Sequence, residues 1–380
     1  MNLDNRLIGV TRRVRITPYT RRVESCGVTS YSVYNHMLLP AGYQSLEDDY
    51  WHLCKYVQVW DVAAERQVEL KGPDAARLAQ LMTPRDLSKI ALLQGKYAPV
   101  CDEKGRLLND PIVIKLAEDR FWFSLADSDI KLFAKGLAIG FGLEVDVFEP
   151  DVSPLAVQGP LADDLCARVF GEEVRSIRFF HGKFLPWRGE QVYVARSGWS
   201  HQGGFEIYLH RGDMGEMLWD ELFAKGADLN VAPGCPHSTE RVEAGLLSYG
   251  SDMDENDTPF ECGLDSYLDL EADIESISLP ALRAMAGKQT MRLMGVLFNE
   301  EVDTSSTFNL GGACDLFSNG EWIGEVRTQT WSFRYKKYMM MVLFKMDYLA
   351  KHDSITIDGK VGQIYKLPFG VEALKSSQGE

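Results

Sequence analysis

Residues 99–114 read Pro-Val-Cys-Asp-Glu-Lys-Gly-Arg-Leu-Leu-Asn-Asp-Pro-Ile-Val-Ile. A charged turn around Gly105 separates two apolar runs, and this pattern predicts a β-hairpin. Asp110 stands where the second strand is expected to begin, followed by Pro111, which cannot donate to a ladder. We therefore expect a carboxylate at a strand edge, backed by β-branched residues. The alternative is an ordinary turn aspartate, since Asp is common in turns for its local hydrogen bonds.

Composition limits the classes of partner. The chain has 380 residues, enough for two or three domains, with 45% hydrophobic and 25% charged residues. Its formal net charge of −15 argues against a nucleic-acid partner, whose phosphates it would repel. The densest apolar run, residues 339–344, is too short to cross a bilayer, so no membrane partner is expected.

The cysteines and histidines predict neither disulfides nor a metal site. The seven cysteines are scattered and include no Cys-x-x-Cys pair, which favours reduced thiols and a cytoplasmic location. There is no His-Glu-x-x-His and no close His/Cys pairing, so we expect no metal.

Strands alternate with single helices through most of the chain, which predicts an α+β protein rather than one doubly wound sheet. Expected helices span 44–56, 74–82, 130–139, 162–170, 214–225 and 238–247. From about residue 290 to 368, short strands with turn signals predict a small β-barrel or sandwich. We therefore expect two regions, 1–275 with two α+β subdomains and 276–370 with the β-barrel.

Several motifs of catalysis are incomplete or missing. Residues 198–202, Gly-Trp-Ser-His-Gln, fall one glycine short of the Gly-x-Ser-x-Gly turn of a nucleophilic hydrolase. No phosphate-binding Gly-x4-Gly-Lys-[Ser/Thr] loop occurs. What remains is a set of aromatic and carboxylate residues at expected strand edges: Trp60, Tyr97, Asp110, Trp199, Glu206, Tyr208 and Tyr249. Carboxylates and π faces suit a cationic or heteroaromatic ligand, although most such aromatics, taken singly, would be core residues.

An ordered series of motifs resembles the folate-binding T-protein (aminomethyltransferase) family of the glycine cleavage system. The series comprises Trp60-Asp-Val, Ala156-Val-Gln-Gly-Pro160, Arg196-Ser-Gly-Trp-Ser-His-Gln-Gly-Gly-Phe-Glu206 and Glu240-Arg-Val-Glu-Ala-Gly245 with the following Tyr249-Gly, Asp252-Met-Asp-Glu and Thr258-Pro-Phe-Glu261. The resemblance covers nearly the whole chain. It implies a three-domain cloverleaf of two α/β subdomains and a C-terminal β-barrel, with folate in the central hole.

Departures from the T-protein pattern indicate a branch of the family. Gly198-Trp-Ser-His-Gln202 replaces the usual Gly-Tyr-Thr-Gly-Glu, and Asn109-Asp110 replaces the usual Asp-Asp. These variants resemble the dimethylsulfoniopropionate demethylases, which implies methyl transfer from a zwitterionic sulfonium donor to tetrahydrofolate N5. Three alternatives stay open: a T-protein proper, a demethylase of another donor such as glycine betaine or sarcosine, and a non-catalytic folate-binding regulatory protein. The sequence also leaves a homo-oligomer open.

The resemblance implies roles for particular residues, transferred position by position. Glu206 is expected to pair with the pterin, Asp110 to lie beside the reacting folate nitrogens as the catalytic residue, and Tyr97 to pack in the same site. Two further cofactor-binding residues are expected, Arg241 and Tyr249. Trp199, which replaces the family tyrosine, is expected to contact the sulfonium, and the other expected substrate-binding residues are Tyr19, Trp60 and Tyr208.

Overall fold

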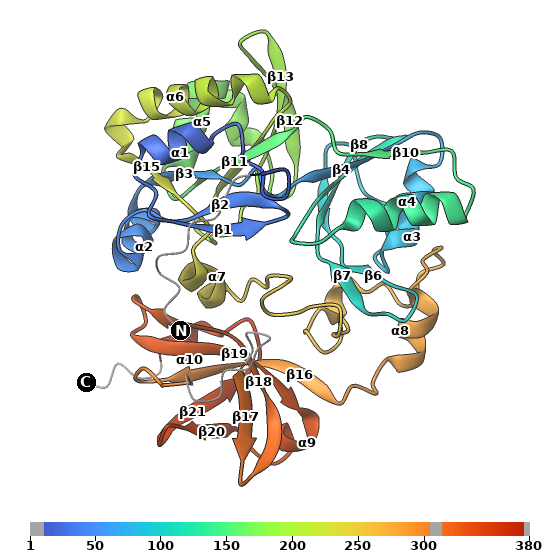
Figure 1. Ribbon diagram of the computed structural model, residues 1–380, viewed down its shortest axis with the longest axis vertical. Helices are drawn as coiled ribbons and strands as arrows, with labels where there is room; N and C mark the ends of the chain where they lie inside the picture. The colour runs from blue at the N-terminus through green and yellow to red at the C-terminus, as the bar shows by residue number, and fades with distance from the viewer. Residues whose placement is uncertain (1–10, 305–313, 376–380) are drawn as a thin grey trace. The chain divides into compact units, whose positions relative to one another are not determined.

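The computed structural model describes residues 11–304 and 314–375. These residues form two compact units, whose elements are labelled in Figure 1. The first unit comprises the chain up to Val68 and residues 149–236, and the second comprises residues 69–148 and the chain from His237 onward. The chain therefore crosses into the second unit after Val68, returns to the first at Glu149, and enters the second again at His237.

A six-stranded sheet forms the centre of the first unit, in the order β12-β13-β14-β11-β3-β15. All its neighbouring strands are antiparallel except the parallel pair β3 and β15. The strands are β3 Val57–Asp61, β11 Ser153–Gln158, β12 Gly182–Trp187, β13 Glu190–Ala195, β14 Gly204–Leu209 and β15 Val231–Gly234. A separate hairpin, β1 Ser30–Tyr34 and β2 Met37–Gly42, turns through Asn35 and His36, which both have positive φ as two-residue hairpin turns prefer.

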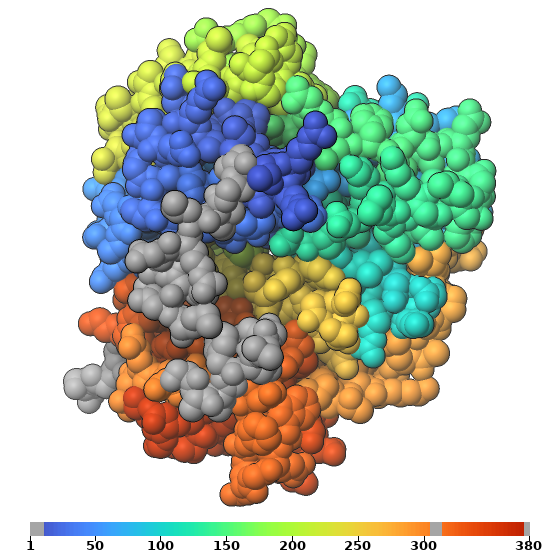
Figure 2. All heavy atoms as spheres, in the orientation of Figure 1, coloured from blue at the N-terminus to red at the C-terminus, as the bar shows by residue number. Residues whose placement is uncertain are grey.

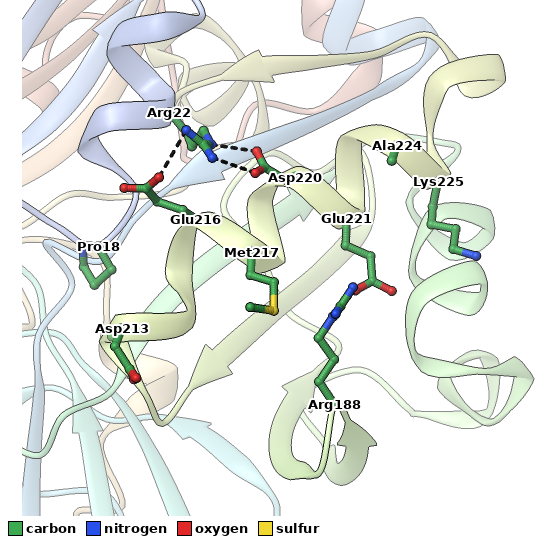
Figure 3. Close-up of a pocket in the computed structure, with 11 residues that line it drawn as sticks. Pro18, Arg22, Arg188, Asp213, Glu216, Met217, Asp220, Glu221, Ala224 and Lys225 are labelled. Carbon is green, nitrogen blue, oxygen red and sulfur yellow. Dashed lines mark hydrogen bonds and ion pairs between the residues drawn. The ribbon is translucent and has the colours of Figure 1, made fainter.

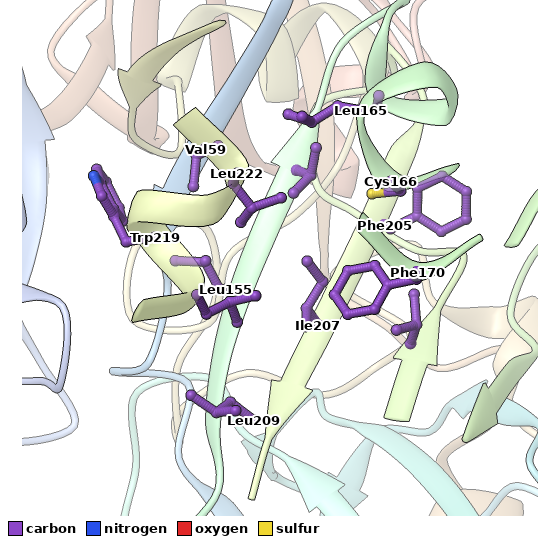
Figure 4. Close-up of a cluster of buried hydrophobic side chains, with 14 of the residues drawn as sticks. Val59, Leu155, Leu165, Cys166, Phe170, Phe205, Ile207, Leu209, Trp219 and Leu222 are labelled. Atoms are coloured by element: carbon purple, nitrogen blue, oxygen red, sulfur yellow. The ribbon is translucent and has the colours of Figure 1, made fainter. Parts of the chain in front are cut away.

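Helices α5 and α6 pack onto this sheet because each has one apolar face. The α5 residues Ala162, Leu165, Cys166 and Phe170 recur at helical spacing and are buried. Figure 4 shows Leu165, Cys166 and Phe170 with Trp219 and Leu222 of α6 and the sheet residues Val59, Leu155 and Ile207, which all belong to one buried cluster. Burying each large side chain stabilises the unit by about 1.5–3 kcal/mol. The helical elements here are α1 Thr20–Ser25, α2 Leu46–Lys55, α5 Ala162–Phe170, η1 Glu172–Ser176, η2 Gly212–Met214, α6 Gly215–Lys225 and η3 Ala227–Leu229.

The second unit begins with a five-stranded sheet in the order β10-β4-β9-β8-β5. Its elements are β4 Gln67–Lys71, α3 Ala75–Met82, β5 Gly95–Tyr97, β8 Ile112–Ala117, β9 Arg120–Ser124, α4 Ile130–Gly140 and β10 Asp146–Phe148. Glu69 is buried in this sheet, where its carboxylate accepts hydrogen bonds from Arg120 Nε at 2.6 Å and from Trp122 Nε1 at 2.8 Å. These bonds explain how the sheet tolerates a buried charge.

The hairpin predicted over residues 99–114 exists, but its second arm is broken at Asp110-Pro111. Before the break, β7 Leu107–Asn109 pairs with β6 Val100–Cys101, and after it β8 pairs with β5 in the five-stranded sheet. Asp110 therefore lies between two strands and does not open one, which corrects the sequence-based expectation. The reason is local, because Pro111 has no N–H to continue the first ladder.

A six-stranded antiparallel sheet completes the second unit, in the order β17-β18-β19-β16-β21-β20. Its strands are β16 Met291–Phe298, β17 Cys314–Ser318, β18 Glu321–Ser332, β19 Lys337–Lys345, β20 Ser354–Ile357 and β21 Lys360–Tyr365. Alternate residues of β19 belong to two hydrophobic clusters, one with Met340, Val342 and Phe344 and one with Met339, Met341 and Leu343. The apolar run is thus a strand buried on both faces, and the predicted all-β region is confirmed. Figure 2 shows its closely packed atoms in orange and red.

The remaining elements of the second unit are α7 Ser238–Ala244, η4 Asp265–Tyr267, α8 Leu279–Met285, α9 Met346–Leu349 and α10 Val371–Lys375. Helix α7 ends three residues earlier than its predicted end at Leu247. Gly245 has a φ of +68°, the left-handed conformation that terminates helices. A Cβ at this position would also collide with Pro368, so the helix stop is reinforced by the chain that packs against it.

Candidate functional site

The predicted site residues fall into two groups, one in each unit. The second unit contains the predicted catalytic residue and three predicted cofactor-binding residues: Asp110, Tyr97, Arg241 and Tyr249. The first contains the predicted pterin carboxylate and the predicted substrate-binding aromatics: Glu206, Trp199, Tyr208, Tyr19 and Trp60.

Asp110 and Tyr97, both predicted as site residues, are in direct contact. Tyr97 comes from the end of β5, and its hydroxyl donates a hydrogen bond to Asp110 Oδ2 at 3.0 Å. The pKa of Asp110 is raised to about 7, chiefly by burial and in smaller part by the charge of Asp252, while the hydrogen bond from Tyr97 and the charge of Arg241 act against this rise. A carboxyl group with this pKa exchanges a proton readily near neutral pH, which suits a general acid or base.

Arg241 is held in an internal network. It lies in α7 and is only 4% exposed. Its guanidinium donates to Asp252 Oδ2 at 2.5 Å and to Thr328 Oγ1 at 3.0 Å, while Thr328 Oγ1 donates to Asp252 Oδ1 at 2.5 Å. Backbone N–H of Ser248 adds a bond to the same carboxylate at 2.7 Å. The network ties α7 to the loop that follows it and to β18.

Tyr249 lies in that loop, where its hydroxyl donates to the backbone carbonyl of Leu107 at 3.4 Å. It packs in one hydrophobic cluster with Cys101, Leu107 and Met253, and Tyr97 packs against this cluster. Tyr249 and Tyr97 therefore share one hydrophobic cluster. Its predicted contact with folate stays a prediction.

Glu206 forms the centre of the group in the first unit. It lies in β14, and its Oε2 accepts hydrogen bonds from Ser197 Oγ at 2.5 Å and from Tyr208 Oη at 3.1 Å. Burial raises the pKa of Glu206, against the lowering effect of these two bonds. The Tyr208 ring packs against Tyr193 at 5.5 Å between centroids. A carboxylate fixed by two hydroxyl donors is suited to pairing with N–H groups of a heterocycle.

Trp199 lies in the connection between β13 and β14, and Gln158 determines its local backbone. Ser200 Oγ donates to Gln158 Oε1 at 2.8 Å, and Gln158 Nε2 donates to the carbonyl of Ser197 at 3.2 Å. A Cβ at Gly198 would collide with the Gln158 side chain. Gln158 thus holds the connection on both sides of the half-buried Trp199.

His201 shows how this chain departs from the T-protein pattern at the same connection. It stands where the T-protein pattern has glycine, and it keeps a positive φ of 58°. Non-glycine residues adopt this conformation at a cost of about 1–2 kcal/mol. The backbone at His201 therefore has the left-handed conformation that glycine favours, although the residue is not glycine.

The other two predicted substrate-binding residues lie in the interior. Tyr19 is 0% exposed and donates to the carbonyl of Ser153 at 2.9 Å. Trp60 is 1% exposed and donates through Nε1 to Gln58 Oε1 at 2.9 Å. Their polar atoms are therefore satisfied within the protein, and a substrate contact at either ring stays a prediction.

Sequence reasoning missed the residues that hold the predicted ones in place. Ser197, Gln158 and Asp252 all stand within the quoted motifs, but no role was inferred for them. Their partners are 9, 42 and 11 residues away in the chain, respectively, so neither strand nor helix periodicity signals these contacts.

Asp61 is a further buried carboxyl that was not predicted as a site residue. It lies at the end of β3 and is 2% exposed. Thr17 Oγ1 donates to its Oδ2 at 2.5 Å, and the backbone N–H of Ala63 donates to its Oδ1 at 3.2 Å. Burial raises the pKa of Asp61 to about 7 despite these two bonds.

We expect Asp61 to make stability depend on pH. An unfolded aspartate has a pKa of about 3.9, so the unfolded chain releases this proton first as pH rises. The free energy of unfolding of the wild type should therefore fall between about pH 4 and 7, by up to about 4 kcal/mol from this group. Asp61→Asn cannot ionise, so its free energy of unfolding should lack this fall. Urea unfolding at pH 5 and pH 8 measures it: relative to the wild type, the variant should be more stable at pH 8 than at pH 5. Parallel pH profiles would remove this role.

A surface hollow of about 900 Å³ in the first unit has none of the predicted site residues in its lining (Figure 3). It is lined by Pro18, Arg188 and residues of α6 and the turn before it. Its charged side chains pair largely with one another, as in the bonds from Arg22 Nε to Asp220 Oδ1 and from Arg188 Nε to Glu221 Oε2, both at 2.7 Å. Paired charges in an open hollow indicate no particular ligand.

The described residues contain neither a cluster of metal ligands nor a membrane-spanning helix. Within residues 11–304 and 314–375, no group of three or more His, Cys, Asp or Glu side chains is arranged to hold a metal ion. Across the same part of the chain, no helix combines the length and apolar character needed to span a bilayer.

Comparison with known proteins gives the family. The family described as GCVT N-terminal domain matches residues 19–272. The chain belongs to this family. An aminomethyltransferase of Lysinibacillus sphaericus is 29% identical over 300 residues, which cover 77% of this chain and 79% of the relative. The GCVT membership confirms the resemblance inferred from the motifs.

A more similar GCVT relative carries a different name. The dimethylsulfoniopropionate demethylase DmdA of Ruegeria pomeroyi is 50% identical over 316 residues, which cover 83% of this chain and 85% of the relative. This identity is well above that to the aminomethyltransferase, which agrees with the branch inferred from residues 198–202.

The fold is that of a solved member of the glycine cleavage system. The crystal structure of aminomethyltransferase T from Bartonella henselae superposes with a TM-score of 0.77 at 21% identity, covering 94% of this chain and 98% of that one. The predicted T-protein-like α+β fold is therefore confirmed.

Proposed function

We propose that this protein is a tetrahydrofolate-dependent demethylase that transfers a methyl group from dimethylsulfoniopropionate to N5 of tetrahydrofolate. The observation that carries the proposal is the 50% identity to the Ruegeria pomeroyi demethylase over most of both chains. The chemistry of two predicted folate-binding residues supports it, because the carboxyl groups of Asp110 and Glu206 are buried and have raised pKa values. We also propose residues 1–275 as the folate-binding region, 276–370 as the β-barrel domain, and a cytoplasmic location.

The proposed reaction needs little activation of its donor. The lone pair of N5 attacks the methyl carbon, the carbon–sulfur bond breaks, and sulfur keeps both electrons as a neutral thioether. The products are methylthiopropionate and, after N5 loses its proton, 5-methyltetrahydrofolate. The protein must align the three reacting atoms, which in the best cases contributes about 7–11 kcal/mol.

Two residues have proposed roles in this reaction. Asp110 accepts the N5 proton, directly or through water, because its pKa of about 7 lets it hold that proton and release it again. Trp199 holds the sulfonium by its π face, an attraction of about 0.5–2 kcal/mol. The hydrogen bond between Ser200 and Gln158 fixes the backbone from which Trp199 projects.

We expect Trp199→Ala to raise the KM for dimethylsulfoniopropionate about 2- to 30-fold, the equivalent of one cation–π contact. Folate affinity should not change. Trp199→Phe is the matched control, because it keeps a π face and should restore most of the affinity. An unchanged KM in both variants would make Trp199 a packing residue.

The first experiment is product analysis after anaerobic incubation of the purified protein with tetrahydrofolate and dimethylsulfoniopropionate. We expect 5-methyltetrahydrofolate and methylthiopropionate in equal amounts. Product only with glycine betaine or sarcosine would move the proposal to another methylated donor, and product only with an aminomethyl-lipoyl donor would move it to the T-protein reaction. Folate binding without turnover of any donor would support a regulatory protein.

A further inference from the structure

Two cations lie beside Tyr97 and cross-link its strand to a neighbouring segment. Arg85 Nη1 donates to the backbone carbonyl of Tyr97 at 2.8 Å. Lys96 Nζ donates to the backbone carbonyl of Asp86 at 2.5 Å. Tyr97 follows Lys96 in the chain and Asp86 follows Arg85, so the two hydrogen bonds cross. The two cationic side chains therefore lie close together. Both side chains are half-buried.

Neither cation forms an ion pair with a carboxylate within the described residues. The adjacent carboxylates are used elsewhere, because Asp86 Oδ1 accepts from the N–H of Ser88 at 2.8 Å and Asp269 Oδ2 accepts from the N–H of Asp86 at 2.7 Å. A guanidinium has five N–H donors and an ammonium has three, so most donors of this pair have no protein acceptor. Two half-buried cations that form no direct ion pair would be stabilised by an anion bound between them.

Burial is the largest influence on the charge of both cations. Burial lowers the pKa of Lys96, and the neighbouring Arg85 lowers it too, while the carboxylates of Asp269 and Asp86 act in the opposite direction. Burial likewise lowers the pKa of Arg85, against the raising effect of Asp269. The nearby carboxylates therefore offset the burial only in part, and an anion between the two side chains would favour their charged forms further.

The cations stand at one end of a line of aromatic rings that begins at Asp110. The Tyr97 hydroxyl donates a hydrogen bond to Asp110, and the Tyr97 ring packs edge-on against the Tyr267 ring at 4.7 Å between centroids. The guanidinium of Arg85 lies over the Tyr267 ring at 4.9 Å. The contacts therefore run from the carboxyl group of Asp110 through the two tyrosine rings to Arg85.

We propose that Arg85 and Lys96 form a carboxylate-binding site for a ligand that also contacts Tyr97. The inference rests on the proposed function, which brings two carboxylate-bearing molecules to the protein: folate through its glutamyl group, and the methyl donor through its own carboxylate. The order of the line favours folate, in which a pterin is followed by an aminobenzoyl ring and then by glutamate. Lys89 lies close enough to Lys96 to influence its pKa, and it would attract further glutamyl carboxylates.

The test is calorimetric binding, without methyl donor, of tetrahydropteroate, tetrahydrofolate and its triglutamate to the full-length protein. The variant is Arg85→Gln/Lys96→Met, and the control is Arg77→Gln, an exposed arginine of the same unit that is paired with Glu275. We expect the wild type to bind tetrahydrofolate about 10-fold or more tighter than tetrahydropteroate, as for charge-assisted hydrogen bonds. The double variant should lose this preference and the control should keep it.

The remaining outcomes distinguish the folate carboxylate from the donor carboxylate, and failure of the carboxylate site from failure of the proposed function. A double variant with unchanged folate affinity and a KM for dimethylsulfoniopropionate raised about 10-fold or more would assign the site to the donor carboxylate. If folate affinity, glutamate preference and KM all stay at wild-type values, the carboxylate site is overturned while the proposed function stands. If the wild type binds none of the three pterins, the proposed function itself fails. Arg85→Lys, which keeps the charge, tests whether the planar guanidinium is needed.

Discussion

Asp110→Asn should lower turnover by about 10²–10⁴-fold, the usual contribution of a positioned general base. The substitution keeps the shape of the side chain and its ability to accept the hydrogen bond from Tyr97, but the amide cannot take a proton. Tetrahydrofolate affinity should therefore change only slightly. The measurement is single-turnover formation of 5-methyltetrahydrofolate together with direct folate binding.

The pH dependence of turnover provides a second readout for Asp110. Only the ionised form of Asp110 can act as a base. Because burial raises its pKa to about 7, the ionised fraction, and with it the rate of the wild type, should rise with pH through about 7. Asp110→Asn should lack this rise. Tyr97→Phe is the matched control: it removes the hydrogen bond that lowers the pKa of Asp110, and the rising limb should move to higher pH.

Three results would argue against this role. Wild-type turnover in Asp110→Asn would remove Asp110 from the reaction. A large loss of folate affinity with normal turnover at saturating folate would make it a binding residue. A pH profile that is the same in all three proteins would assign the titration near pH 7 to another group.

Arg241→Met should destabilise the protein by about 3–5 kcal/mol, the range for removing one partner of a buried ion pair. The Arg241 and Asp252 side chains are 5% and 0% exposed, so the carboxylate left behind would be buried without its cation. Among the described residues, the hydroxyl of Thr328 and the N–H of Ser248 would still donate hydrogen bonds to it. Thermal and urea unfolding of the purified variant measure the effect.

The matched control for Arg241 is Arg77→Met. Arg77 forms a two-point contact with Glu275 through Nε and Nη2, both at 2.8 Å, but both side chains are about half exposed. Exposed pairs contribute little because water solvates the partner that remains. We expect its unfolding midpoint to match the wild type, whereas that of Arg241→Met should fall clearly.

Arg241 was predicted as a cofactor-binding residue, and the same variant separates that role from a structural one. Normal stability with lost folate affinity would give Arg241 a direct part in binding. Lost stability with near-normal folate affinity, measured well below the unfolding temperature, would make it a structural residue of the loop that contains Tyr249.

Local sequence determined much of the fold because its causes are local. The apolar spacing of residues 162–170 defines the buried face of α5, and the glycine after Ala244 ends α7. The motif between Arg196 and Glu206, together with the other quoted motifs, was enough for the GCVT family and for the demethylase branch. The position of Asp110 after a charged turn was also readable, although Pro111 breaks the strand there.

Tertiary structure alone decided which side chains meet. The bonds from Ser197 to Glu206, from Ser200 to Gln158 and from Arg241 to Asp252 join residues on different elements. The crossed contacts of Arg85 and Lys96 likewise depend on how two backbone segments lie side by side. Periodicity reports which face of an element is buried but not what it is buried against. Raised pKa values at Asp61 and Asp110 follow from that same packing, since desolvation depends on the whole surroundings of a carboxyl group and not on its neighbours in sequence.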